Sequence, residues 1–188
     1  EDMNLRLIAE RFATYGVARA CGKVLLALIL LAAPARADEV TVLALGDSLT
    51  QGYGLPQGQG FVPRLDAWLA ARGHEVELIN GGVSGDTTAG GAARVGWSLT
   101  PEVDAMIVAL GGNDMLRGID PAVAKENLET ILQTAAEHSV AVLLVGMQAP
   151  GNYGPDYKRA FDAMYPALAE THDTLSFDNF FKGLGTDD

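Results

Sequence analysis

The sequence predicts an α/β protein built on a parallel sheet. Short apolar runs, bounded by glycine or polar residues, alternate with longer segments whose apolar residues recur at helical spacing. This alternation predicts right-handed crossovers with helices on both faces of the sheet, and strands that are buried on both faces. With 188 residues, of which 48% are hydrophobic, the chain is long enough to bury one core.

Four apolar runs are predicted strands, at residues 40–45, 76–79, 105–110 and 140–145. A further core stretch covers residues 175–181. After the first run, a predicted helix ends at Arg72-Gly73 and places on one face Phe61, Leu65, Trp68 and Leu69.

Two longer helices are predicted in the second half of the chain. One begins with Asp120 as N-cap and Pro121 as its first residue, and its apolar stripe is Ala124, Leu128, Ile131, Leu132 and Ala135. The other starts near Pro155, and its stripe, most simply interpreted as core, is Tyr157, Phe161, Met164, Tyr165 and Leu168.

Residues 1–37 have the pattern of a secretory signal peptide. Basic residues precede an apolar run at 24–33, and Pro34-Ala35-Arg36-Ala37 supplies an A-x-A ending. We expect cleavage after Ala37 and a periplasmic or secreted mature domain over residues 38–188. An uncleaved membrane anchor is the alternative, but the run has only about half of the ~20 residues that span a bilayer, so we expect no stable membrane insertion.

Charge and cysteine content exclude several kinds of partner. A net charge of −11 disfavours nucleic acid and anionic membranes, because lysine and arginine patches supply that affinity. The single cysteine, Cys21, lies in the predicted leader, so the mature domain has no thiol chemistry. His74, His138 and His172 are scattered without metal-ligand spacing.

A polar or glycine-rich segment follows each of the four predicted strands. The carboxyl ends of parallel strands meet at one edge of a sheet, and the binding crevice lies outside that edge. We therefore expect the functional site among these segments, which are Gly46-Asp47-Ser48, residues 80–85, Gly111-Gly112-Asn113-Asp114 and Gln148-Ala149-Pro150.

Ser48 is the candidate nucleophile at this edge. Taken alone, a serine after a strand more often caps a helix or forms a turn. Here residues 82–87 offer backbone N–H groups at glycines, and Asn113 offers a side-chain amide. Acyl transfer needs a hydroxyl beside such donors, because they stabilise the oxyanion of the tetrahedral intermediate.

Three motifs resemble the conserved blocks of the GDSL (SGNH) hydrolases. They are G-D-S-L-T at 46–50, S-G-D-T-T at 84–88 and G-G-N-D at 111–114, in this order and spacing. Residues 146–154, with Tyr157 and residues 163–166, further resemble the periplasmic arylesterase and multifunctional acyl-CoA thioesterase I / lysophospholipase L1 group. The resemblance covers about residues 39–181. The G-x-S-x-G elbow of α/β-hydrolases is absent at Ser48.

The resemblance implies a fold, a role for each site residue and a substrate class. Ser48 is the implied nucleophile and its N–H the first oxyanion donor, Gly85 gives the second donor through its backbone N–H, and Asn113 gives the third through its side chain. The implied fold is a flavodoxin-like three-layer α/β/α sandwich with a mostly parallel sheet. The implied substrate is a small acyl ester or thioester, and neither a metal nor a cofactor is expected.

Three aspartates beside these motifs are expected to be structural. Asp47, Asp86 and Asp114 each adjoin a glycine or an implied oxyanion residue, where a carboxylate more often caps a helix or holds a loop.

The proton acceptor for Ser48 is missing from the sequence. In the family it is the histidine of a late D-x-x-H block, and residues 1–188 contain no D-x-x-H. We expect that block, and a final helix that would cover one sheet face, beyond residue 188. His172, His74 and His138 are expected to end helices away from Ser48. Losing such a histidine costs about 10⁶ in turnover in one protease, so we expect very low turnover from residues 38–188 alone.

Two hypotheses follow from these observations. In the first, the protein is a serine ester or thioester hydrolase that acts through an acyl-serine intermediate, and the domain at 38–188 is incomplete at its C-terminus. In the second, the chain is a catalytically silent fragment or an acyl-ligand-binding domain. The three intact loops favour the first hypothesis, because a protein that no longer catalyses has no need to keep them.

Overall fold

Five parallel strands form one sheet in the computed structural model, which describes residues 40–183. They are β1 (Val40–Gly46), β2 (Val76–Gly82), β3 (Ala105–Ala109), β4 (Ala141–Val145) and β5 (Leu175–Phe177). Their order in the sheet is β2-β1-β3-β4-β5, the flavodoxin-like order. The predicted α/β class with a parallel sheet is therefore confirmed. The predicted signal peptide, residues 1–37, lies outside the described residues.

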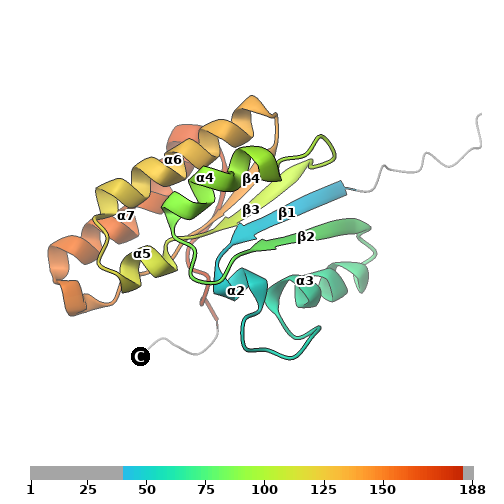
Figure 1. The fold of residues 1–188 in the computed structure, drawn as a ribbon, viewed down its shortest axis with the longest axis horizontal. Helices are drawn as coiled ribbons and strands as arrows, with labels where there is room; N and C mark the ends of the chain where they lie inside the picture. Colours follow the sequence, from blue (N-terminus) through green and yellow to red (C-terminus); the bar gives the residue numbers. More distant parts are fainter. Residues whose placement is uncertain (1–39, 184–188) are drawn as a thin grey trace, which may run out of the picture. The chain divides into compact units, whose positions relative to one another are not determined.

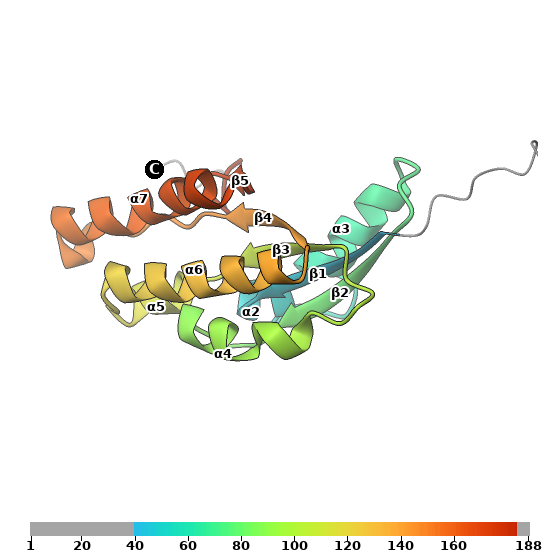
Figure 2. The ribbon, with the colours of Figure 1, turned by 90° about the horizontal axis from the view of Figure 1, so that it is seen from above.

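Helices lie on both faces of the sheet (Figure 1). On one face, α4 (Thr88–Ser98), α6 (Pro121–Glu137) and α7 (Pro155–His172) lie side by side, as Figure 2 shows. On the other face, α2 (Ser48–Gln51) and α3 (Phe61–Ala70) lie next to β2. The short helices α5 (Gly112–Leu116) and η1 (Gly151–Tyr153) follow β3 and β4.

The core lies between the sheet and α4, α6 and α7. Alternate strand residues such as Leu43, Met106 and Leu144 point into it and are buried. The predicted stripe of α6 is buried throughout, and the Asp120 side chain caps the helix by accepting from the Ala122 N–H at 2.9 Å. The stripe of α7 is buried from Phe161 onward. Both helix predictions are confirmed.

Helix α4 is an element that the apolar pattern did not predict. Three glycines lower its intrinsic helix propensity, and its apolar stripe is short. Tertiary contacts stabilise it instead: Val95 is buried in the core, and the Thr87 side chain caps the first turn by accepting from the Gly90 N–H.

Helix α3 buries a different residue from the one expected. Trp68 was expected to share the apolar face, but it is 51% exposed, and the guanidinium of Arg72 lies 3.7 Å from its ring centre. Val62 is the buried residue. The expectation was wrong because α3 packs on β2 at the margin of the sheet, so its outer side chains face solvent.

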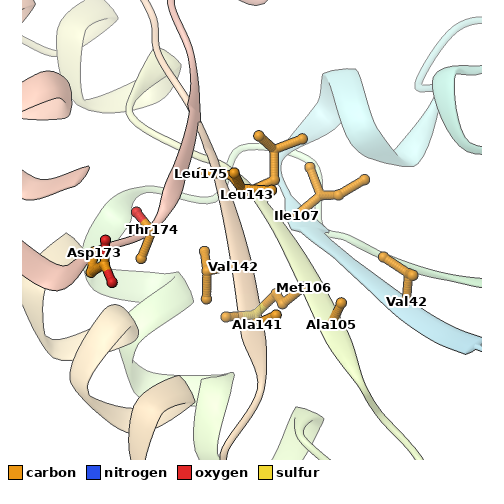
Figure 3. Close-up of a pocket in the computed structure, with 10 residues that line it drawn as sticks. All are labelled: Val42, Ala105, Met106, Ile107, Ala141, Val142, Leu143, Asp173, Thr174 and Leu175. Carbon is orange, nitrogen blue, oxygen red and sulfur yellow. The ribbon is translucent and has the colours of Figure 1, made fainter. Parts of the chain in front are cut away.

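Within residues 40–183, no helix covers the sheet face opposite the core from β3 to β5. Ile107, Leu143 and Leu175 lie on this face, where they help to line a hollow of about 260 Å³ (Figure 3). Leu175 is 73% exposed. The prediction of strands buried on both faces is therefore wrong for this part of the sheet.

We predict that Ile131→Ala lowers the free energy of unfolding by about 2–5 kcal/mol, because Ile131 is fully buried between α6 and the sheet. Val123→Ala on the same helix, where Val123 is 46% exposed, should change it by less than about 0.5 kcal/mol. Urea unfolding followed by circular dichroism measures both. An equal loss of unfolding free energy in the two variants would contradict the burial of Ile131 in the core.

Candidate active site

The carboxyl ends of three neighbouring strands are level with one another. Gly46 at the end of β1 pairs with Gly82 of β2 on one side and with Ala109 of β3 on the other. The segments that carry Ser48, Gly85 and Asn113 therefore leave the sheet at the same edge. In this strand order, the connections turn in opposite directions between β1 and β3, which is where ligands bind in such sheets.

Ser48 is the first residue of α2 and is half-buried. The N-cap of this helix is Asp47, whose Oδ1 accepts from the Leu49 N–H at 2.9 Å. Ser48 is therefore not the N-cap of this helix, which is the role that a serine after a strand more often has. The expected structural role of Asp47 is confirmed.

Gly85 occupies a tight turn after β2. The Asp86 N–H donates to the Val83 carbonyl at 3.1 Å, and Gly85 has a φ of +81° at the third position of this turn. A positive φ at that position favours glycine, because a side chain strains the left-handed conformation. The turn thus fixes the direction of the Gly85 backbone.

Asn113 joins all three segments. Its Nδ2 donates to the Oδ2 of Asp47 at 3.1 Å and to the backbone carbonyl of Asp86 at 2.9 Å. One carboxamide therefore contacts the residue before Ser48 and the residue after Gly85. The structure brings together the three residues that the sequence singled out.

The Asp86 side chain is held by an arginine, Arg94, that the sequence motifs do not indicate. Arg94 donates from Nε to Asp86 Oδ2 at 2.8 Å and from Nη2 to the carbonyl of Gly46 at 3.0 Å. The two side chains are only 11% and 12% exposed. The residue was overlooked because it belongs to α4, the helix that was not predicted. The expected structural role of Asp86 is confirmed.

Asp114 holds the start of α4 against the loop after β3. It is fully buried, and its two oxygens accept from the Thr88 N–H at 2.9 Å and from the Thr88 hydroxyl at 2.6 Å. Asn127 of α6 in turn donates to that hydroxyl at 3.1 Å. All polar groups of this buried cluster are paired, as burial requires. The expected structural role of Asp114 is confirmed.

Tyr165 of α7 holds the segment that precedes Asn113 by a hydrogen bond. Its hydroxyl donates to the Leu110 carbonyl at 3.0 Å, and burial raises the pKa of this phenol well above its ordinary value. A Cβ on Gly111 would lie 2.1 Å from the Tyr165 hydroxyl oxygen. The loop therefore needs glycine at position 111.

None of the three histidines in the chain lies at this edge. His74 precedes β2, His138 caps the end of α6 before β4, and His172 ends α7 before β5. Each is at the amino end of a parallel strand, roughly a strand length of 15–20 Å from the carboxyl edge. Their predicted placement away from Ser48 is confirmed. Within residues 40–183, no cluster of histidine, cysteine or carboxylate side chains could hold a metal ion.

Residues 44–187 match the GDSL-like lipase/acylhydrolase family. The chain is 43% identical over 161 residues to the esterase TesA of Pseudomonas aeruginosa, covering 85% of this chain and 79% of that protein. It is 37% identical over 148 residues to thioesterase 1/protease 1/lysophospholipase L1 of Escherichia coli K12, covering 78% and 69%. Among solved structures, the SGNH-hydrolase family esterase AlinE4 superposes with a TM-score of 0.78 at 41% identity, covering 81% and 82%.

The similarity to these esterases agrees with the flavodoxin-like sheet and with the serine at its carboxyl edge. Together they show that the protein is an ester hydrolase. The chain belongs to the GDSL-like lipase/acylhydrolase family, the SGNH or GDSL hydrolases. The family that the three motifs predicted is confirmed.

We predict a pH-dependent effect of Asp47→Asn on stability. Burial raises the pKa of Asp47 above 3.8 and outweighs the N–H donors of Leu49 and Asn113, which lower it. A raised pKa in the folded state adds stability below about pH 3.8, and this contribution is lost as the pH rises through the folded-state pKa. The difference in unfolding free energy, wild type minus Asp47→Asn, should therefore decrease as the pH rises from below 3.8 to above the folded-state pKa of Asp47. A pH-independent difference in urea unfolding contradicts the prediction.

Proposed function

We propose that the protein hydrolyses carboxylic esters and thioesters through an acyl intermediate on Ser48. The observation that carries this proposal is the pair of hydrogen bonds from Asn113 to Asp47 and to the Asp86 carbonyl. They hold a serine hydroxyl, a glycine N–H and an amide side chain at one edge of the sheet. The relatives named esterase and thioesterase support the same chemistry.

In the proposed reaction, Ser48 Oγ attacks the carbonyl carbon of the substrate while its proton passes to a base. The C–O or C–S bond then breaks, and the leaving alcohol or thiol takes up the proton. Water attacks the acyl-serine in the second half, which releases the carboxylic acid and restores the Ser48 hydroxyl. The negative oxygen of each intermediate accepts from the N–H groups of Ser48 and Gly85 and from the Asn113 amide, and each such donor is worth roughly 10²–10³ in rate.

The base is treated separately from the nucleophile in our test. In the family, the base belongs to a D-x-x-H block, and residues 1–188 contain no such block. Acylation of Ser48 by a reactive phosphonate is therefore measured on the 188-residue chain. Turnover is measured on a chain to which a D-x-x-H segment has been joined after residue 188.

The alternative, a silent acyl-ligand-binding domain, is not favoured. The loops of such a domain would need neither a donor set around Ser48 nor the buried ion pair that holds the turn of Gly85. We further propose that the protein is periplasmic or secreted, on the basis of the leader at residues 1–37. Within the part of the chain that the structure describes, no helix is long and apolar enough to cross a membrane.

We predict that a fluorophosphonate probe labels the wild-type chain on Ser48 and that Ser48→Ala abolishes the labelling. On the extended chain, the same substitution should abolish hydrolysis of p-nitrophenyl butyrate, because the proposed acyl intermediate forms on that hydroxyl. Ser176→Ala is the control, since Ser176 is exposed on β5. Mass spectrometry of the labelled peptide makes the assignment. Undiminished labelling of Ser48→Ala would remove Ser48 from the mechanism.

We predict that Asn113→Ala slows labelling of Ser48 about 10²–10³-fold, because one oxyanion donor is lost. The rate constant is measured from the time course of probe incorporation. Thermal unfolding of the same sample checks that the variant is folded. A folded variant that is labelled at the wild-type rate would show that the Asn113 amide does not contact the reacting oxygen.

A further inference from the structure

One of the segments that the sequence places at the carboxyl edge has no part in the proposed reaction. It is Gln148-Ala149-Pro150, here called the β4 wall because it follows β4. Strands β1, β3 and β4 are neighbours, and their pairing brings their carboxyl ends level. The ends of β1 and β4 are therefore two strand spacings apart, about 10 Å. The β4 wall thus borders the space beside Ser48.

Two side chains of α7 bind both polar backbone groups of Ala149. The Ala149 N–H donates to Asp162 Oδ1 at 2.8 Å, and the Ala149 carbonyl accepts from Lys158 Nζ at 2.7 Å. Lys158 also donates to Asp162 Oδ2 at 2.8 Å, so the two side chains form an ion pair. Hydrogen bonds to charged groups are stronger than those between neutral groups. The pair therefore fixes both peptide planes that meet at Ala149.

The β4 wall depends on this pair because it is irregular in structure. Residues 146–150 belong to no helix or strand, and Ala149 is only 2% exposed. Buried backbone groups need hydrogen-bond partners, and the side chains of α7 supply them here. Met147 and Ala149 are buried in the core, whereas Gln148 between them is exposed. The pair therefore also decides where the Gln148 side chain lies at the edge.

The segment after the β4 wall is joined to the helix that carries Asn113. Helix η1 follows the wall directly, and the Tyr153 hydroxyl in it donates to the Leu116 carbonyl of α5 at 3.2 Å. Asn113 belongs to the same short helix α5. The wall is therefore held by α7 at Ala149, and the turn that follows it is held by α5.

The ion pair lies at the surface and therefore adds little to the free energy of unfolding. The Lys158 side chain is 43% exposed and that of Asp162 is 28% exposed. Exposed ion pairs between residues four apart on a helix contribute little to stability. Helix α7 carries a second exposed pair, in which Arg159 donates to Asp156, so that two residues of α7 are joined to each other. Comparison of the two pairs separates the loss of charge on α7 from the loss of the bonds to the β4 wall.

We propose that Lys158 and Asp162 are positioning residues, which hold the β4 wall at a fixed distance from Ser48 and so limit the length of the substrate group that fits on that side. The pair acts through Ala149. Without the pair the wall shifts, and a displacement of about 1 Å can change a rate up to 10²-fold. This inference rests on the proposed function, because it assumes that the reacting carbonyl lies at Ser48.

The test compares two neutral fluorophosphonates, one with a methyl and one with a decyl chain, as labels of Ser48 on the 188-residue chain. Lys158→Met and Asp162→Ala each break the pair, and we expect each to change the ratio of the two labelling rate constants about tenfold. Arg159→Met and Asp156→Ala break the control pair and should leave the ratio within about twofold of the wild-type value. A general loss of structure would slow both probes equally and leave the ratio unchanged.

Amide hydrogen exchange at Ala149, followed by nuclear magnetic resonance, measures the hold on the β4 wall directly. We expect exchange to be faster in Asp162→Ala than in the wild type, because the N–H loses its acceptor. Lys158→Met retains that acceptor, so this variant should stay folded, and thermal unfolding checks it. If Asp162→Ala unfolds, the ratio of labelling rates in Lys158→Met decides alone.

Each outcome decides the proposal. A ratio that shifts by more than about twofold in the folded variants of Lys158 and Asp162, and not in those of the control pair, supports it. A smaller shift, or an equal shift in the control pair, overturns it. Unchanged exchange at Ala149 in folded Asp162→Ala also overturns it, because the wall would then be held without the pair. Failure of the proposed function is a different result, the absence of any Ser48 labelling in the wild type.

Discussion

The two hydrogen bonds donated by the Asn113 carboxamide hold the site together. One ends on the carboxylate before Ser48, and the other ends on the carbonyl after Gly85. The three segments follow different strands and are far apart in sequence, so no local interaction could keep them in register. Both N–H groups of the amide are engaged in these two bonds, so one of them must be released when the amide donates to a developing oxyanion.

The contact made by Asn113 depends in turn on buried polar groups that are fully paired. Arg94 fastens the Asp86 side chain to the end of β1, Thr88 satisfies both oxygens of Asp114, and Tyr165 supports the Leu110 carbonyl. An unpaired member of such a network would carry the full cost of desolvation. The network therefore favours one arrangement of the loops. It also engages the carboxylates of Asp47, Asp86 and Asp114.

The helices that form the core also carry the side chains that hold the site loops in place. Helix α4 brings Arg94, α6 brings Asn127 and α7 brings Tyr165, and all three helices pack on one face of the sheet. Core packing and site geometry are thus coupled, since a shift of α4 against the sheet would move the turn of Gly85. Among the described residues, 40–183, no helix packs on the opposite face between β3 and β5, where Leu175 is exposed.

The sequence by itself determined the class of fold, the strands, helices α6 and α7, and the positions of Ser48, Gly85 and Asn113. These follow from signals that are local in the chain, namely apolar spacing, a cap such as Asp120 and three short motifs at strand ends. Only the tertiary structure decided the existence of α4, the exposure of Trp68 and the role of Arg94. A glycine-rich helix is stable only against its neighbours. The role of a charged side chain such as that of Arg94 depends on which carbonyl or carboxylate of another segment it binds. That contact forms only when the sheet has aligned the ends of its strands.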